Sequence, residues 1–209
     1  MNVILINGSP KEKGCTYTAL TEIAGALEKQ GVEVEIFHIG SQPISGCIDC
    51  RVCRTLKQGC PIDKLVDSFA KKAESADGLI FGSPVHYASA SGAITSFMDR
   101  LFFAHGHKFK GKPASIIVSC RRGGASATFD QLNKYFSICQ MPIVTSQYWN
   151  MVHGNTPEQV KKDAEGLQTM RTLGNNMAWL LKCIDAGKKA GIELPASEKK
   201  IYKNFIDGQ

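Results

Sequence analysis

The chain has 209 residues, a net charge of +6 and a hydrophobic content of 43%, which suffices for one well-buried core. Its lysines are spread along the sequence instead of forming one basic stretch, so we expect no nucleic-acid partner. No apolar run approaches the ~20 residues of a membrane-spanning helix, and the first residues lack the pattern of a secretion signal. A cytoplasmic protein without a membrane partner is therefore expected.

The first part of the chain alternates apolar runs with helical patterns. Residues 3–7 predict a buried strand, and residues 32–39 alternate apolar and polar positions, as expected for a strand at a sheet edge. Between them, four apolar residues at helical spacing indicate a helix: Leu20, Ile23, Ala24 and Leu27. Residues 64–74 predict a second helix, and residues 78–82 a further buried strand.

Predicted strands and helices continue to alternate in the rest of the chain. We predict a helix over 91–103, a strand over 114–119 and a helix marked by Phe129, Leu132 and Phe136. A fifth strand is predicted over 142–146, and Pro157 is expected to begin one long final helix. Five strands that are each followed by a helix favour a doubly wound parallel sheet, whose ligands bind at the carboxyl ends of the strands.

We expect one domain over residues 1–195. The remaining segment, 196–209, is polar and rich in lysine, with apolar residues interleaved. It is interpreted either as an arm that packs on a neighbouring subunit or as a loosely docked helix.

The loop after the first strand is rich in glycine and hydroxyl groups and leads directly into a helix. The first-turn amides and the helix dipole can hold a phosphate there, with hydroxyls of Ser9, Thr16 and Thr18 as further donors. The loop matches neither G-x-G-x-x-G nor G-x-x-x-x-G-K-[ST], which favours a monophosphate such as that of FMN. An ordinary capped connection between strand and helix is the alternative.

Two more loops follow predicted strands at the same edge. Pro84 keeps the chain extended after the third strand, and Tyr87 could stack on a flat ring. Gly123 and Gly124 follow the fourth strand and would offer free backbone donors. Each loop is weak evidence alone, but three such loops at one sheet edge indicate a ligand site.

Half of the cysteines lie in one short stretch, residues 46–61, which follows the second strand. Cys47, Cys50 and Cys53 have the C-x2-C-x2-C spacing with which thiolates converge on one centre, and Cys60 could be a fourth ligand. A single [4Fe–4S] cluster is our main hypothesis. Zinc is an alternative, as is a reduced loop that binds nothing; disulfides are the least favoured interpretation.

Four motifs together carry a family resemblance: Gly8-Ser9-Pro10, Gly82-Ser83-Pro84-Val85, Phe97-Met98-Asp99-Arg100 and Gly123-Gly124. In this order, the chain resembles the NAD(P)H-dependent FMN reductases of the flavodoxin-like superfamily, and its cysteine stretch resembles the iron-sulfur flavoproteins. The resemblance covers about residues 2–151. It implies a three-layer sandwich with a five-stranded parallel sheet in the order 2-1-3-4-5.

The resemblance also implies the site. FMN would be held by the first loop, with its ring between the other two loops, near a subunit interface of a homodimer or homotetramer. The implied FMN-binding residues are Ser9, Pro10, Lys11, Cys15, Thr16, Tyr17, Thr18, Pro84, Val85, His86, Tyr87, Arg121, Gly123, Gly124 and Ala125.

Four positions depart from the family pattern or need interpretation. Cys15 stands where Asn or Ser is more usual, and a thiol at a helix N-terminus can have a depressed pKa and be reactive. His86 replaces a common aromatic residue and is read as a hydrogen-bond partner of flavin or substrate, or as a solvated loop histidine. Asp99 and Arg100 are interpreted as an ion pair on one helix or as a subunit contact.

The favoured function is an oxidoreductase in which hydride from NAD(P)H reaches flavin N5, and electrons leave to a quinone, a flavin, oxygen or an iron-sulfur partner. No catalytic side chain is required, because the flavin is the reactive group. One alternative is an FMN and [4Fe–4S] electron-transfer protein that works with ferredoxin-like partners and not with NAD(P)H. A metal-binding protein with a vestigial flavin site and a nucleotide-phosphate hydrolase are weaker alternatives, and the latter lacks a Walker lysine.

Overall fold

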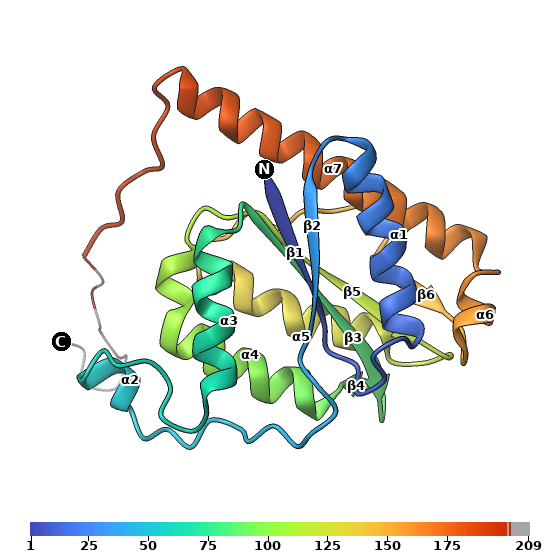
Figure 1. Ribbon diagram of the computed structural model, residues 1–209, viewed down its shortest axis with the longest axis horizontal. Helices are drawn as coiled ribbons and strands as arrows, with labels where there is room; N and C mark the ends of the chain where they lie inside the picture. Colours follow the sequence, from blue (N-terminus) through green and yellow to red (C-terminus); the bar gives the residue numbers. More distant parts are fainter. Residues whose placement is uncertain (200, 202–209) are drawn as a thin grey trace.

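A computed structural model describes residues 1–199 and 201, and its centre is a parallel β-sheet (Figure 1). Five parallel strands lie in the order β2-β1-β3-β5-β6. A two-residue strand, β4 (Ser89–Ala90), pairs antiparallel with the end of β3 and makes the sheet six-stranded, one more than predicted. The bounds of the parallel strands are β1 Asn2–Asn7, β2 Glu33–His38, β3 Gly78–His86, β5 Ala114–Cys120 and β6 Met151–His153.

Helices cover both faces of the sheet, which confirms the predicted three layers. Figure 1 shows α1 (Cys15–Lys29) and α7 (Ala164–Lys189) on one side of the sheet. The other side carries α3 (Lys64–Ser75), α4 (Gly92–His105) and α5 (Ala125–Ile138). The short elements are α2 (Val52–Thr55), the 3₁₀ helix η1 (Gly106–Phe109) and α6 (Pro157–Val160).

The two faces have separate apolar cores because successive strand residues point to opposite sides. Val3 and Leu5 of β1 pack with α1 and α7, whereas Ile4 and Ile6 pack with α3, α4 and α5. All four side chains are buried. Burial of each such side chain stabilises the fold by about 1.5–3 kcal/mol relative to exposure.

The predicted position of the fifth strand is wrong. Residues 142–146 form only an isolated bridge between Ile143 and Ala114, and the strand β6 begins at Met151. The physical reason lies in Asn150, whose Nδ2 donates to Ser115 Oγ (2.9 Å) and to the Ile116 carbonyl (3.1 Å). The Asn150 side chain thus takes hydrogen-bonding positions at the edge of β5 where a regular strand would have paired.

The long final helix is also interrupted. α6 begins with Pro157 in its first turn, as predicted, but it ends at Val160, and α7 starts anew at Ala164. Asp163 separates them, because its carboxylate accepts from the amides of Gly166 (2.9 Å) and His153 (2.6 Å). The carboxylate caps α7 and ties the break to β6.

The chain after α7 returns across the molecule. Lys110 Nζ donates to the carbonyl of Pro195 (2.6 Å) and to Ser197 Oγ (2.6 Å). The beginning of the predicted C-terminal arm therefore contacts its own chain, and residues 200 and 202–209 of that arm lie outside the described residues. Among the helices described, none is long and apolar enough to cross a membrane.

Candidate functional site

The three loops singled out in the sequence meet at the carboxyl edge of the sheet. The amide of Gly8 donates to the Gly82 carbonyl (2.8 Å), which joins the first loop to β3. Thr16 Oγ1 and Ser119 Oγ are hydrogen-bonded at 2.8 Å, which joins the first turn of α1 to β5. The predicted convergence of these loops is confirmed.

The first loop is shaped by its own hydrogen bonds. Asn7 Oδ1 accepts from the Ser9 amide (3.1 Å), and Asn7 Nδ2 donates to the Glu12 carbonyl (2.8 Å). Ser9 Oγ accepts from the Lys11 amide (3.1 Å), so its own proton remains for another acceptor. His38 Nε2 donates to the Ser9 carbonyl (2.8 Å) and fastens the loop to the end of β2. A loop fixed in this way is organised before any ligand arrives.

Two helix N-termini at this edge lack a side-chain cap. Of the described helices with at least eight residues, α3, α4 and α7 are capped by Asp63, Ser91 and Asp163, whereas the N-cap residues of α1 and α5 are glycines, Gly14 and Gly124. The first amides of a helix have no partner within the helix, and the helix dipole makes that end positive. α1 and α5 follow β1 and β5, so both uncapped ends lie at the same edge. This arrangement suits an anionic ligand.

The other two loops press against each other through backbone. Tyr87 and Ala88 form a left-handed turn between β3 and β4, with φ of 49° and 61°. Gly124, with φ of 93°, lies beside that turn, and a Cβ on it would come within 2.4 Å of Ala88 Cα. Only glycine fits this position. Ser89 Oγ donates to Gln131 Oε1 (2.9 Å), which ties the turn to α5.

The predicted FMN-binding residues differ in exposure. Thr18 Oγ1 donates to the Gly14 carbonyl (3.1 Å), which uses its only proton inside α1. Tyr87 is fully exposed. Of the rest, one group is exposed (Pro10, Lys11, His86, Arg121, Gly123), another half-buried (Cys15, Tyr17, Pro84, Val85, Gly124) and a third buried (Ser9, Thr16, Ala125).

Cys15 does not have the depressed pKa that its place at a helix N-terminus suggested. Burial raises the pKa of the Cys15 thiol and outweighs the lowering by its own backbone amide and by Lys11. Its Sγ donates to the Gly154 carbonyl at 3.7 Å. The expected lowering of the Cys15 pKa is therefore wrong, and the reactivity of the thiol stays to be measured.

The cysteine loop, residues 46–61, lies along α4. Gly46 is close to Ser96, since a Cβ on the glycine would be 3.7 Å from Ser96 Oγ, and Arg54 stacks on the Phe103 ring at 4.7 Å. Figure 1 shows this long connection between β2 and α3, with α2 within it. The loop thus starts beside the N-terminal half of α4. The first residue of α4 follows the β3–β4 hairpin at the carboxyl edge of the sheet.

The four thiols of this loop differ in exposure. Cys47 and Cys50 are exposed, Cys53 is half-buried and Cys60 is buried. The pKa of Cys53 is raised, first by burial and then by Cys60. Within the described residues, no three His, Cys, Asp or Glu side chains are gathered closely enough to hold a metal ion.

Arg100 holds the end of this loop, a role that the sequence analysis missed. Its buried guanidinium donates from Nη1 to Asp63 Oδ2 (2.7 Å) and from Nε to Cys60 Sγ (3.2 Å). The same hydrogen bond from Arg100 lowers the pKa of Asp63. The expected Asp99–Arg100 ion pair is wrong, because Asp99 instead accepts from the Tyr135 hydroxyl.

The donor chemistry of the loop fits an iron-sulfur cluster. Four thiols in one loop are the ligand set that a [4Fe–4S] cluster takes. In addition, Arg100 Nη2 is buried and has no hydrogen-bond partner in the described part of the chain. A buried donor without a partner is costly, and an anionic cluster would satisfy it.

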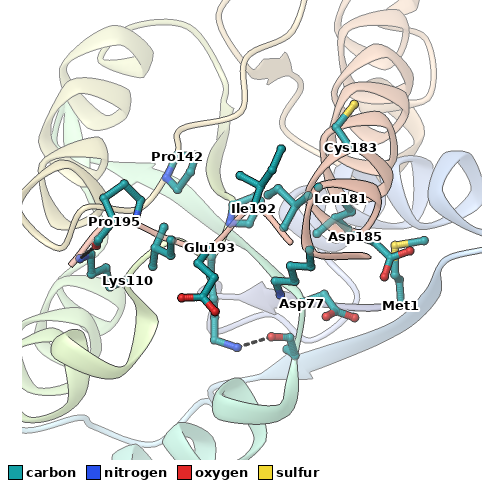
Figure 2. A pocket seen from close by; sticks show the side chains of 18 residues that line it. Met1, Asp77, Lys110, Pro142, Leu181, Cys183, Asp185, Ile192, Glu193 and Pro195 are labelled. Carbon is teal, nitrogen blue, oxygen red and sulfur yellow. Dashed lines mark hydrogen bonds between the residues drawn. The ribbon is translucent and has the colours of Figure 1, made fainter. Parts of the chain in front are cut away.

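A separate cavity of about 610 Å³ lies at the opposite edge of the sheet (Figure 2). It is bordered by Met1, Asp77 and Pro142, by α7, and by residues 192–195. Lys112 lies in the wall of this cavity and donates to the carbonyls of Glu74 (2.8 Å) and Ala76. Its positive charge therefore lies at the C-terminal end of α3. This cavity is a seam between α7 and the returning C-terminal segment, remote from the three loops.

Sequence comparison identifies related proteins. The family described as NADPH-dependent FMN reductase matches residues 1–156. An iron-sulfur flavoprotein of Methanocaldococcus jannaschii is 34% identical over 195 residues, which cover 88% of this chain and 99% of that protein. An FMN-dependent NADPH-azoreductase of Staphylococcus saprophyticus is 31% identical over 56% of this chain and 54% of its own.

Solved structures agree on the fold. RosB with bound 8-demethyl-8-formylriboflavin-5′-phosphate superposes with a TM-score of 0.69 at 13% identity, over 99% of this chain and 92% of RosB. A WrbA-like flavodoxin from Agrobacterium tumefaciens gives a TM-score of 0.57 at 16% identity, over 87% and 97% of the two chains. The expected flavodoxin-like fold is confirmed.

Proposed function

The chain belongs to the NADPH-dependent FMN reductase family, and we propose that it passes electrons from NAD(P)H through FMN to a quinone, a flavin or an iron-sulfur acceptor. The observation that carries this proposal is the pair of uncapped helices, α1 and α5, at the edge where the three loops meet. Two donor-rich ends at one edge suit a ligand with a phosphate and a polar ring.

The FMN phosphate is assigned to the first loop. The amides at the start of α1 would bind its oxygens, and the free proton of Ser9 Oγ would add a hydrogen bond. Lys11, exposed on the same loop, supplies a positive charge nearby. Thr16 acts through its hydrogen bond to Ser119, which fixes the first turn of α1 against β5.

The flavin ring is assigned to the space beside residues 84–87 and 121–125. FMN supplies hydride acceptance at N5 and the return of electrons to an acceptor. The backbone donors at the start of α5 would bind the polar edge of the ring and stabilise the negative charge that arises on reduction. The exposed Tyr87 and Arg121 would border the entry for nicotinamide and acceptor. No side-chain acid or base is required in this arrangement.

We further propose that Cys47, Cys50, Cys53 and Cys60 ligate one [4Fe–4S] cluster. Its support is the donor set, the partnerless donor of Arg100 and the name of the archaeal relative. The cysteine loop starts near Ser96, in the N-terminal half of α4, and α4 begins at the edge where the flavin is assigned.

A second candidate function follows from the same loop. A protein with FMN and a cluster could exchange electrons with a ferredoxin-like partner and not use NAD(P)H. The exposure of Cys47 and Cys50 favours this candidate, because it places two ligands where a partner protein could approach. The two candidates differ in whether NAD(P)H reduces the flavin.

We assign residues 1–195 to one FMN-binding domain and propose a cytoplasmic homodimer or homotetramer. Cysteines that bind a cluster must stay free of disulfides, which suits a reducing compartment.

The test is an anaerobic purification followed by flavin extraction, iron and sulfide analysis, and an absorption spectrum. FMN that bleaches when NADH or NADPH is added would support the reductase. FMN that bleaches only with a reduced ferredoxin would favour the second candidate. A protein that retains no flavin and binds none on titration would overturn both.

A further inference from the structure

Arg100 connects both ends of the cysteine loop to α4. Its Nη1 donates to the Ser45 carbonyl (3.2 Å), just before the loop, and to Asp63 (2.7 Å), just after it. Its Nε donates to the sulfur of Cys60 (3.2 Å) inside the loop. One side chain thus closes the stretch from residue 45 to residue 63 into a ring on the surface of α4.

The guanidinium is more deeply buried than an ordinary ion pair requires. The Arg100 side chain is 0% exposed, whereas its partner Asp63 is 41% exposed. Nη2 remains without any hydrogen-bond partner in the residues that the structure describes. Burial of a charge with an unused donor is unfavourable unless another group comes to meet it.

A purely structural role explains only part of this arrangement. The ion pair with Asp63 would fasten α3 to α4 without any contact to a thiol, and Asp67 already holds the Cys60 amide at 3.0 Å. Such a role accounts neither for the hydrogen bond to the Cys60 sulfur nor for the burial of the partnerless Nη2 donor. Both are explained if the loop binds an anionic, sulfur-rich group.

We infer that Arg100 is a positioning residue of the cysteine loop: it holds the loop closed and offers Nη2 to a thiolate-ligated iron-sulfur cluster. This inference rests on the proposed cluster. Donors to cluster sulfurs and nearby positive charge raise the reduction potential, because they stabilise the added electron.

The loop-closing part is tested on the apoprotein by limited trypsin digestion. The loop contains the sites Arg51, Arg54 and Lys57, and their cleavage reports its opening. Arg100→Met is expected to accelerate cleavage at these sites about tenfold relative to wild type. Arg171→Met is the matched control, since Arg171 pairs with Glu22 (2.5 Å) far from the loop. Equal cleavage rates in the two variants would overturn the inference.

The cluster part is tested after anaerobic reconstitution with iron and sulfide. Arg100→Met is expected to retain less iron and to show a more negative midpoint potential in an EPR-monitored titration, with Arg100→Lys in between. Unchanged iron content and potential in Arg100→Met would overturn this part.

The two proposals fail separately. If the wild-type protein takes up no iron, the proposed cluster and the proposed role of Nη2 are wrong. The trypsin digestion still tests whether Arg100 holds the loop closed. If Arg100→Met does not fold, Asp63→Asn replaces it, because asparagine can still cap α3 while the ion pair is lost. Asp63→Asn should then speed loop cleavage, and an unchanged rate would overturn the loop-closing role.

Discussion

Thr16 Oγ1 and Ser119 Oγ lie 2.8 Å apart, and this hydrogen bond joins the first turn of α1 to the end of β5, 103 positions later in the sequence. Both side chains are buried. The bond holds the first turn of α1 against β5, next to the start of α5. The spacing between the proposed phosphate and ring sites is therefore fixed by protein contacts that exist before FMN binds.

Thr16→Val removes one partner of this bond and leaves Ser119 buried without it. We expect a loss of about 1–3 kcal/mol in the free energy of unfolding. FMN affinity should fall as well, because the first turn of α1 is no longer held in place. Urea unfolding and fluorescence titration with FMN measure the two effects. Thr172→Val, which affects an exposed hydroxyl, is the control and should change neither.

Gly124→Ala tests the contact between the two ring loops. Its left-handed φ and the 2.4 Å approach to Ala88 Cα exclude a side chain, so the turn and the start of α5 must shift. We expect at least about 1–3 kcal/mol of strain and a loss of FMN affinity of tenfold or more. Gly25→Ala in α1 is a control outside the proposed site, because a Cβ there also meets no atom within 4 Å. Equal FMN affinities of the two variants would contradict the assignment.

The sequence predicted most of the fold from its apolar runs. Residues 3–7, 78–82 and 114–119 became the buried strands because their apolar side chains fill both faces of the sheet. The fifth strand was misplaced because the Asn150 side chain, and not a backbone pattern, decides where pairing begins. Such a tertiary contact leaves no periodic signal in the sequence.

Only part of the site could be predicted, again because tertiary contacts leave no periodic signal in the sequence. The glycine-rich loops were visible because glycine marks tight backbone approach, as at Gly124. The contact of Arg100 with the cysteine loop was missed, although Arg100 lies between Phe97 and Ala104 on the buried stripe of α4. A charged residue on an apolar stripe is a signal for a buried partner, but it does not reveal that the partner is Cys60, forty positions earlier.

Cys15 should react slowly with alkylating agents. Its pKa is raised by burial, so less thiolate is present near neutral pH than at an ordinary cysteine. We expect iodoacetamide to modify the exposed Cys183 at least about tenfold faster, as measured by peptide mass spectrometry. Faster modification of Cys15 would instead support the reactive thiolate that its helix position suggested.

The ion pair of Asp63 and Arg100 should make stability depend on pH. The pKa of Asp63 is lower in the folded protein than in the unfolded chain, where it is about 4. The pair therefore stabilises the fold above that value, and the contribution is lost as the pH falls through the folded pKa. Because Asp63 is 41% exposed, we expect less than about 1 kcal/mol.

Urea unfolding of wild type and Asp63→Asn at a series of pH values measures this contribution. The difference in unfolding free energy should be largest near neutral pH and should shrink below about pH 4. A difference that stays constant across the series would mean that the ionised carboxylate contributes nothing.

Cys50→Ala should abolish iron uptake while FMN binding persists. The four cysteines of the loop would share one cluster, so loss of one ligand removes the centre, whereas the flavin loops are separate from residue 50. Cys183→Ala is the control, because Cys183 is exposed on α7 and distant in sequence from the loop. Anaerobic iron and sulfide analysis, with flavin extraction from the same samples, measures both cofactors. Equal iron contents in the two variants would mean that the loop cysteines do not hold the cluster.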